Sequence, residues 1–153
     1  MGAPHARGPK DERVEGRSPH DPEEFSMEQA LVRTSIHGFE ATVDRLVEAI
    51  AASGATLFAR LDQREAAIAA GLDLRPTVLL VFGNPRGGTP LMDAVPLVAL
   101  DLPLKVLVWE DGGVVFVAYT PIATAAARYG ITGHEPLLTA LQQAMETIVS
   151  CVV

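Results

Sequence analysis

The sequence is poor in the residues that build disulfide frameworks, metal clusters and membrane spans. It has a single cysteine, Cys151, which excludes an internal disulfide and any cysteine-cluster zinc or iron–sulfur site. No apolar run approaches the roughly 20 residues of a membrane-spanning helix. Acidic residues outnumber lysine and arginine, 19 against 12, and nucleic-acid binders need a basic patch. We therefore expect a soluble, cytoplasmic protein with neither a membrane nor a nucleic acid as partner.

The remaining composition fits one globular domain preceded by a tail. The chain has 153 residues, of which 48% are hydrophobic. That is enough for one hydrophobic core that needs no disulfide or metal site to stabilise it. Residues 1–26 hold four prolines, three glycines and few apolar side chains, so we expect a disordered tail without the apolar stretch of a secretory signal. Residues 27–153 form the expected single domain. Translation from Met1 or from Met27 remains open.

Hydrophobic periodicity predicts alternating strands and helices in the domain. Residues 77–82 are apolar on both faces, which is typical of a central strand. Acidic and glycine residues at 110–113 separate two β-rich runs, which indicates a hairpin. The expected strands are 30–35, 56–61, 77–82, 104–109 and 114–119, and the expected helices are 39–53, a short one from 62 to 71, 122–129 and 136–152.

This order of elements predicts the α+β class. A hairpin after two strand–helix units favours a mixed, mostly antiparallel sheet with helices packed mainly on one face, in two layers. The last helix repeats apolar residues at 3-4-3-4 spacing from Leu138 to Val152. Such a stripe packs either on the domain's own sheet or against a second subunit.

A glycine-rich segment follows the central strand and is the main chemical feature of the sequence. Gly83 and Gly88 have the spacing of a phosphate-binding P-loop, but Thr89 stands where the lysine belongs, so we do not expect a P-loop enzyme. A helix opening at Thr89 and Pro90 would direct free N–H groups at an anion, with Arg86 as a cationic clamp. The alternative is that these glycines only form a tight turn. The candidate ligand-binding residues in this segment are Gly83, Asn84, Arg86, Gly87, Gly88 and Thr89.

Three blocks of the sequence closely resemble the DUF302 domain family. They are residues 71–77, 82–92 and 100–111, and the resemblance extends over roughly residues 35–130. It implies a small bacterial α+β domain that forms homodimers and has no established activity. Many relatives carry histidine where this chain has Gln63, and glutamine neither titrates nor ligates metals well.

Two classes of function follow from these residues, with a third beside them. The first is a non-catalytic homodimeric module that binds a small anionic metabolite at the glycine-rich segment, with Trp109 and Glu110 lining the pocket. The second is an enzyme with Glu110 or Asp111 as general base beside the same segment. The third is a purely structural or protein-interaction domain. The sequence identifies no catalytic residue and no cofactor, and its two domain histidines, His37 and His134, lack the spacing of a metal site.

Overall fold

The chain folds around a five-stranded antiparallel sheet in the order β1-β5-β4-β3-β2. The structure is a computed structural model that describes residues 30–153, so the predicted tail and Met27 lie outside the described residues. The strands are β1 (Leu31–Thr34), β2 (Thr56–Asp62), β3 (Thr77–Gly83), β4 (Leu104–Asp111) and β5 (Val114–Tyr119). The helices are α1 (Phe39–Ala52), α2 (Gln63–Ala69), α3 (Pro85–Ala94), the 3-10 helix η1 (Pro96–Leu100), α4 (Ile122–Arg128) and α5 (Glu135–Ser150).

These elements confirm the α+β class and the hairpin between β4 and β5. All four strand pairings are antiparallel, and the first two strands of the chain, β1 and β2, form opposite edges of the sheet. Gly112 and Gly113 form the hairpin turn with φ of 56° and 80°, a backbone region that glycine adopts without steric cost.

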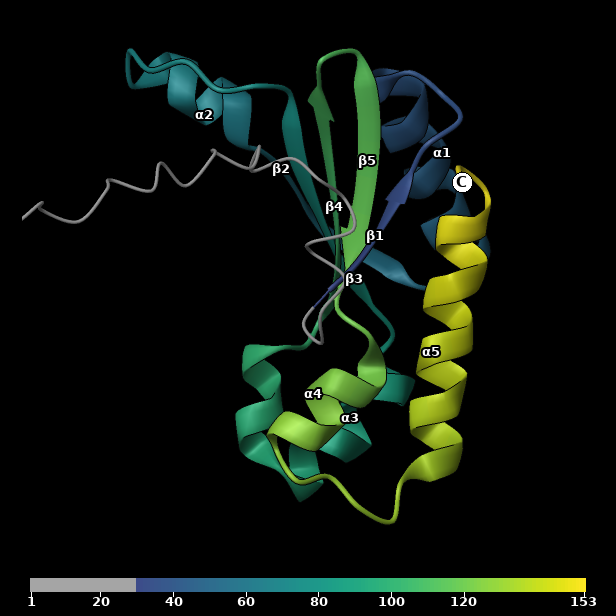
Figure 1. The fold of residues 1–153 in the computed structure, drawn as a ribbon. Coiled ribbons are helices and arrows are strands. Elements are labelled where there is room, and N and C mark those ends of the chain that lie inside the picture. The colour runs from purple at the N-terminus through teal and green to yellow at the C-terminus, as the bar shows by residue number, and fades with distance from the viewer. Residues whose placement is uncertain (1–29) are drawn as a thin grey trace, which may run out of the picture.

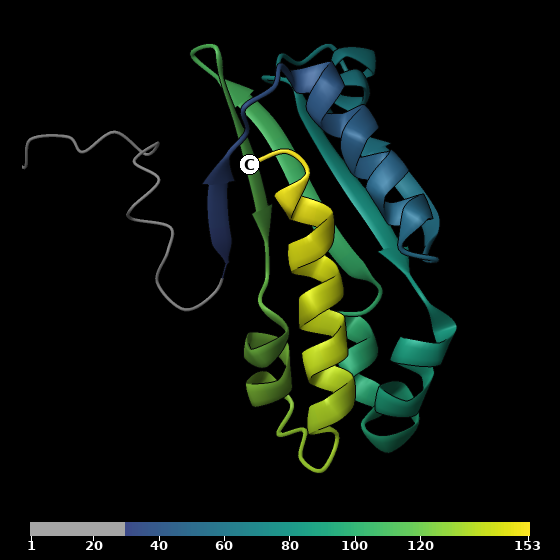
Figure 2. The same ribbon diagram turned by 90° about the vertical axis from the view of Figure 1, so that its right-hand side faces the viewer.

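Helices α1 and α5 cover one face of the sheet and bury the main core against it (Figures 1 and 2). Leu46 and Ile50 of α1 and Met145 and Ile148 of α5 are at most 1% exposed. They meet alternate residues of the strands, including Val78, Leu80, Phe82, Val106 and Val108. The stripe on α5 therefore packs on the domain's own sheet, which is the intramolecular alternative.

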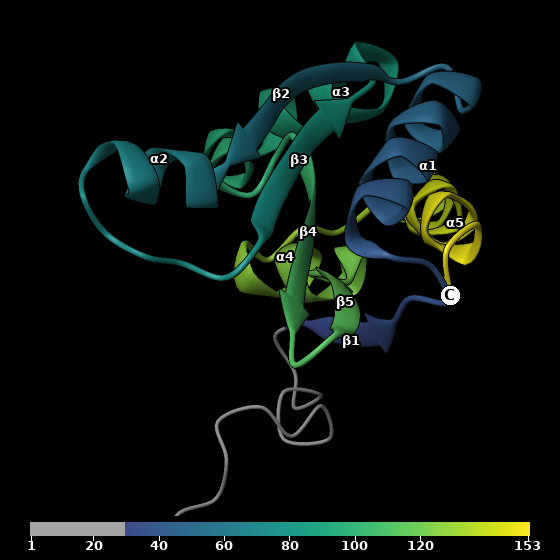
Figure 3. The same cartoon turned by 90° about the horizontal axis from the view of Figure 1, so that it is seen from above.

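The other face of the sheet carries apolar side chains that α1 and α5 do not cover. Because strand side chains alternate, Leu79, Val81, Leu107 and Trp109 lie on this face, and all four are half-buried. Trp109 stacks on Phe116 with ring centroids 5.1 Å apart. Helix α2 projects on this side (Figure 3) and has no buried residue. We call this surface, centred on the four residues named here, the open sheet face.

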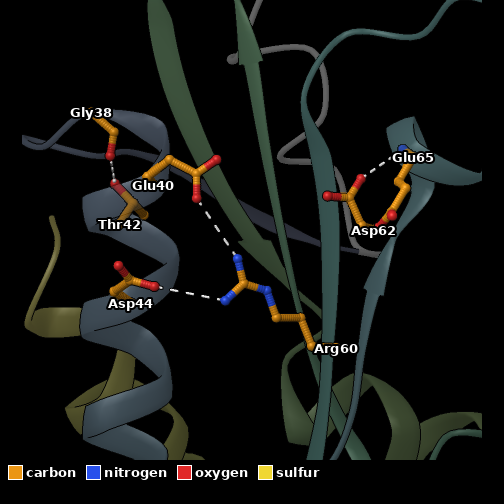
Figure 4. A network of polar contacts seen from close by, with 7 residues as sticks. All are labelled: Gly38, Glu40, Thr42, Asp44, Arg60, Asp62 and Glu65. Carbon is orange, nitrogen blue, oxygen red and sulfur yellow. Dashed lines mark hydrogen bonds and ion pairs between the residues drawn. The ribbon is translucent and has the colours of Figure 1, made fainter. Parts of the chain in front are cut away.

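Two small polar groupings fix the ends of α1 and α2. Figure 4 shows Arg60 of β2 between Glu40 and Asp44 of α1, with nitrogen–oxygen distances of 3.7 Å to each carboxylate. Asp62 accepts a hydrogen bond from the Glu65 N–H at 2.9 Å and caps α2. All three ion-pairing side chains are exposed, so these pairs position the helix more than they stabilise it.

Helices α3, η1 and α4 lie together beyond the end of the sheet, beside the first half of α5 (Figure 1). They form a second, smaller apolar cluster around Leu91, Val98, Ala126 and Ile131. Leu138 and Leu141 of α5 pack against both this cluster and the main core. The junction between the two clusters is where the structure leaves room for a ligand.

Candidate functional site

A cavity of about 270 Å³ lies where β3 ends, α3 begins and β4 begins. We call it the larger cavity. Its walls are predominantly apolar and come from β2, the segment around Gly83, α3, the segment before β4, and α5. The lining residues are Phe58, Gly83, Asn84, Pro85, Gly88, Thr89, Met92, Leu102, Pro103, Leu104 and Leu141. An apolar pocket with a few polar groups is the usual form of a small-molecule site.

Phe58 lines the cavity from an irregularity in β2. Leu57 pairs with Phe82 and Ala59 pairs with Val81, so the register shifts between Leu57 and Ala59 and leaves Phe58 as the additional residue. A bulge of this kind redirects a side chain out of the regular alternation. A Cβ placed on Gly83 would lie 3.4 Å from the Phe58 ring and 3.4 Å from Pro103. Gly83, the Phe58 ring and Pro103 therefore lie close together and form one wall of the cavity.

Helix α3 begins five residues earlier than the sequence indicates. The expectation of a helix opening at Thr89 and Pro90 is wrong, because Asn84 caps the helix and Pro85 is its first residue. Asparagine is a strong N-cap and proline is favoured in the first turn. The Arg86 N–H donates to Asn84 Oδ1 at 3.0 Å, and the Gly87 and Gly88 N–H groups donate to the Asn84 carbonyl at 2.9 and 3.1 Å. These donors are therefore engaged within the helix start.

The structure brings together only part of the predicted glycine-rich site. Gly83, Asn84, Gly88 and Thr89 line the larger cavity, whereas Arg86 and Gly87 do not. A Cβ on Gly87 would approach Leu141 Cδ2 to 3.0 Å, so Gly87 allows close packing of α3 on α5. Arg86 is exposed and has no ion-pair partner among residues 30–153.

Trp109 and Glu110 lie at the opposite end of the sheet from the glycine-rich segment. Leu104 pairs with Phe82 beside the cavity, and Trp109 pairs with Thr77 at the other end of β3. Glu110 is six positions after Leu104 along β4, which corresponds to about 20 Å in a strand. The register therefore does not join Trp109 and Glu110 to the glycine-rich segment in one site.

The register of β3 and β4 also places Glu110 and Asp111 too far from the glycine-rich segment to act there as a general base. A base must lie within hydrogen-bond reach of the proton that it abstracts, and both carboxylates lie at the far end of β4. Asp111 also forms an ion pair with Arg75 at 3.0 Å. Among the lining residues of the larger cavity there is no histidine, cysteine, lysine or carboxylate.

The remaining candidate residues are dispersed. His37 precedes α1, and His134 caps α5 without a side-chain hydrogen bond to the helix. Gln63 is the first residue of α2, at the end of β2 away from the cavity. In the described part of the chain, no three histidine, cysteine or acidic side chains are grouped so as to hold a metal ion.

Cys151 is the one cysteine of the chain. It is exposed, directly after the end of α5. Partial desolvation is the main cause that raises the pKa of its thiol. A thiol with a raised pKa is a weak nucleophile at neutral pH, because the thiolate is the reactive form.

Several residues of the larger cavity were not among the sequence candidates. They are Phe58, Met92, Leu102, Pro103, Leu104 and Leu141. In the sequence they have the pattern of ordinary core positions, because apolar residues in strands and helices are usually core. One signal in the sequence pointed to Phe58. Leu57 and Phe58 are adjacent apolar residues in an expected strand, which departs from the alternation of a half-buried strand.

The fold and the cavity define a small α+β domain with one antiparallel sheet and a ligand-sized pocket at its end. The family model "Domain of unknown function DUF302" matches residues 31–149. The chain belongs to the DUF302 family. Its structure is similar to the crystal structure of an uncharacterized conserved DUF302 protein from Bacillus stearothermophilus, with a TM-score of 0.73 and 18% identity over 81% of this chain and 98% of that one.

Part of the chain is also similar to larger proteins. It is 39% identical over 98 residues to proteins named "Fluoride-specific ion channel FluC 1" from Brucella suis and Brucella abortus. The match covers 63% of this chain but only 39% and 36% of those relatives. No helix within residues 30–153 has the length and apolar character needed to cross a membrane.

Proposed function

We propose that this domain is a non-catalytic binding module for a small molecule that has an apolar body and one anionic group. The larger cavity supports this proposal most directly. Its volume of about 270 Å³ exceeds that of an apolar cavity of about 150 Å³ that holds benzene. A ligand of about ten non-hydrogen atoms is therefore of suitable size.

The lining favours an apolar body over an inorganic anion. Phe58, Met92 and Leu141 provide hydrocarbon and sulfur surface, and Asn84 and Thr89 provide the polar side chains. The N–H groups at the start of α3 are already bonded to Asn84. A phosphate or a fluoride ion would therefore find few free donors there, whereas an alkyl or aryl group gains about 25 cal/mol per Å² of buried apolar surface.

Arg86 favours anionic ligands although it does not line the larger cavity. It stands next to Pro85, which lines the cavity, and it has no ion-pair partner among residues 30–153. An exposed arginine attracts anions to a nearby opening, and salt screens this attraction. We expect Arg86→Ala to weaken anion binding by a few-fold at low ionic strength and by less at high ionic strength.

The absence of reactive groups from the lining supports a non-catalytic role. General acid–base or nucleophilic catalysis needs a titratable or nucleophilic side chain at the ligand. Thr89 is the sole hydroxyl residue among the lining residues of the larger cavity, and no base lines it.

A thermal-shift panel on the full chain tests the proposal. The probes are octanoate, 3-phenylpropanoate, inorganic phosphate and fluoride. A probe at about 100 times its dissociation constant adds roughly 2.7 kcal/mol, which corresponds to several degrees for this domain. We expect octanoate and 3-phenylpropanoate to raise the midpoint and phosphate and fluoride to leave it unchanged.

A cavity-filling variant locates the binding. A Cβ on Gly88 would lie 3.5 Å from Met92 Cε and 3.9 Å from Leu102 Cδ1, both residues of the wall. Gly88→Leu therefore fills the larger cavity while keeping a helix-forming residue in α3. Ala94→Leu, at the exposed end of the same helix, is the matched control. Octanoate binding that survives Gly88→Leu, or a panel without any shift, would overturn the proposal and favour a structural or protein-interaction role.

The proposal includes a homodimer that forms through the open sheet face. Its central residues, Leu79, Val81, Leu107 and Trp109, are half-buried apolar side chains on β3 and β4. Leu61, Ile68 and Leu72, which are 45%, 58% and 67% exposed, flank this face and enlarge it. Exposed and half-buried apolar side chains gathered on one face favour an interaction surface.

Light scattering after size exclusion tests the dimer. We expect the full chain to have twice its 16.2 kDa mass and Leu107→Glu to give a folded monomer. Leu100→Glu changes an exposed residue of η1 away from the sheet and should remain dimeric. A monomeric parent protein, or a dimeric Leu107→Glu variant, would refute this arrangement.

The fluoride channel relatives do not extend the proposal to ion transport. This chain spans about two-fifths of their length, and their name describes the whole proteins. The probe panel includes fluoride because the relatives are named as fluoride channels.

A further inference from the structure

A second, smaller cavity of about 80 Å³ adjoins the larger one. The two share Leu102, Leu104 and Leu141 as lining residues. Leu102 and Leu141 are half-buried side chains, and Leu104 is 8% exposed. The partition between the cavities is therefore built from leucine side chains.

The two cavities differ in the charges around them. Within residues 30–153, no charged side chain lines the larger cavity, whereas Lys105 and Asp101 both line the smaller one. Thr120 adds a hydroxyl to the smaller cavity. A molecule that extends from the larger into the smaller cavity thus passes from an apolar to a polar environment.

Lys105 is a half-buried ammonium with incomplete hydrogen bonding. Its Nζ donates to the carbonyl oxygens of Asp101 at 3.4 Å and Pro103 at 3.3 Å, both longer than usual for an N–H···O bond. A lysine ammonium has three N–H donors, so one is left over. No carboxylate within residues 30–153 forms an ion pair with it. A half-buried cation with a remaining donor is a suitable partner for an anion.

The Asp101 carboxylate does not fill this role, because it is already paired. Its Oδ2 accepts a hydrogen bond from Arg128 Nη1 at 2.7 Å. The same carboxylate raises the pKa of Tyr129 through a side-chain hydrogen bond. Asp101 therefore offers its carbonyl oxygen to Lys105 and its carboxylate to Arg128 and Tyr129, and no carboxylate of residues 30–153 forms an ion pair with Lys105.

We propose that one amphipathic monocarboxylate occupies both cavities, with its apolar body in the larger cavity and its carboxylate on Lys105 in the smaller one. This inference rests on the proposed binding function and adds the residue that contacts the charge and the class of ligand. Leu102 and Leu141 turn aside to admit the chain. Arg86 attracts the anion from outside, and Lys105 holds it.

The test compares octanoate with 1-octanol, which has the same chain without the charge. We expect the parent protein to prefer octanoate, and Lys105→Met to lower octanoate affinity at least tenfold while leaving 1-octanol affinity unchanged. Lys105→Arg keeps the charge and should keep a preference for octanoate. Lys105→Gln replaces Lys105→Met in the comparison if the latter does not fold. An unchanged preference in the neutral variant would overturn the inference and leave the proposed function intact, whereas failure of both probes to bind the parent protein would overturn both.

A labelling experiment gives a second readout without a substitution. Reductive methylation with formaldehyde modifies lysine amines, and mass spectrometry separates Lys105 from Lys10, the other lysine of the chain. We expect octanoate to slow methylation of Lys105 relative to Lys10, and 1-octanol to have a smaller effect. Equal methylation with and without octanoate, at a concentration that saturates the thermal shift, would contradict contact with Lys105.

Discussion

Replacing Ser35 by alanine tests whether a buried hydroxyl joins the start of the domain to its end. Ser35 follows β1 and is 9% exposed. Its Oγ donates to the Val152 carbonyl at 2.9 Å, lies 2.7 Å from Thr42 Oγ1, and accepts the His37 N–H at 3.1 Å. One hydroxyl therefore connects β1, α1 and the segment after α5.

The cost of this change follows from which partners keep another bond. The Val152 carbonyl still accepts the Ile36 N–H at 2.9 Å, and Thr42 Oγ1 still donates to Gly38 at 2.9 Å. The His37 N–H loses its partner, which costs about 1–2 kcal/mol, and the two lost hydroxyl contacts add about 1 kcal/mol. We expect the free energy of unfolding to fall by about 2–3 kcal/mol.

Urea unfolding followed by tryptophan fluorescence measures this change. Trp109 is the only tryptophan of the chain and stacks on Phe116 in the sheet, so its emission reports on the folded core. At about 2.1 cal/mol/K of unfolding entropy per residue, a domain of this size loses about 4 °C of midpoint per kcal/mol. The thermal midpoint of Ser35→Ala should therefore fall by about 8–12 °C.

Ser53→Ala is the matched control. The Ser53 hydroxyl donates to the Ile50 carbonyl at 2.7 Å but is exposed at the end of α1. Water replaces such a bond, so the expected loss is below about 0.5 kcal/mol. The reasoning is refuted if Ser35→Ala stays within 0.5 kcal/mol of the parent protein, or if both variants lose the same amount.

Three further outcomes follow from the structure. Gly88→Ala should raise the unfolding free energy by about 0.5–1 kcal/mol, measured by urea unfolding, because the new Cβ meets only ordinary contacts; Gly87→Ala should gain less, because its Cβ would lie 3.0 Å from Leu141. Desolvation is the main cause that raises the pKa of Tyr119 above 10.0, so stability is full below the unfolded-state pKa and falls as pH rises through that value toward the folded-state one. Urea midpoints measured from pH 9 to 11 should fall less steeply in Tyr119→Phe, and equal slopes would contradict this. The thiol of Cys151 should react with a disulfide reagent at pH 8 more slowly than free cysteine, because its pKa is raised; a rate equal to that of free cysteine would argue against the shift.

The local elements could be predicted from short-range patterns. A continuous apolar run predicted β3, and two β-rich runs around the acidic–glycine turn predicted β4 and β5, all within two residues at each end; the spacing of apolar residues predicted α1 and α5 with similar accuracy. These signals depend on neighbours within about four residues. The start of α3 was missed because the Gly-rich composition obscured the Asn84 cap and Pro85, two local helix-start signals.

The candidate site was only half predictable. Gly83, Asn84, Gly88 and Thr89 were identified and line the larger cavity, because glycines near a strand end often mark close approach of the backbone. Trp109 and Glu110 were assigned to the same pocket, and the register of β3 and β4 separates them from it. A residue's distance along an antiparallel strand depends on the pairing, which the sequence of one strand does not specify.

The sequence by itself determined the class of the fold, the hairpin and the family, because these depend on composition, periodicity and motifs that are local in the chain. The tertiary structure decided where the ligand-sized space lies. The larger cavity exists because a bulge redirects Phe58, because Pro103 packs beside Gly83, and because α5 brings Leu141 to residues far away in sequence. The tertiary structure also places Lys105, which no pattern in the sequence singled out, at the smaller cavity. Its Nζ donates to two carbonyl oxygens of residues 30–153, which leaves one N–H for a ligand. Packing between distant segments creates such spaces, and no window of the sequence contains both walls.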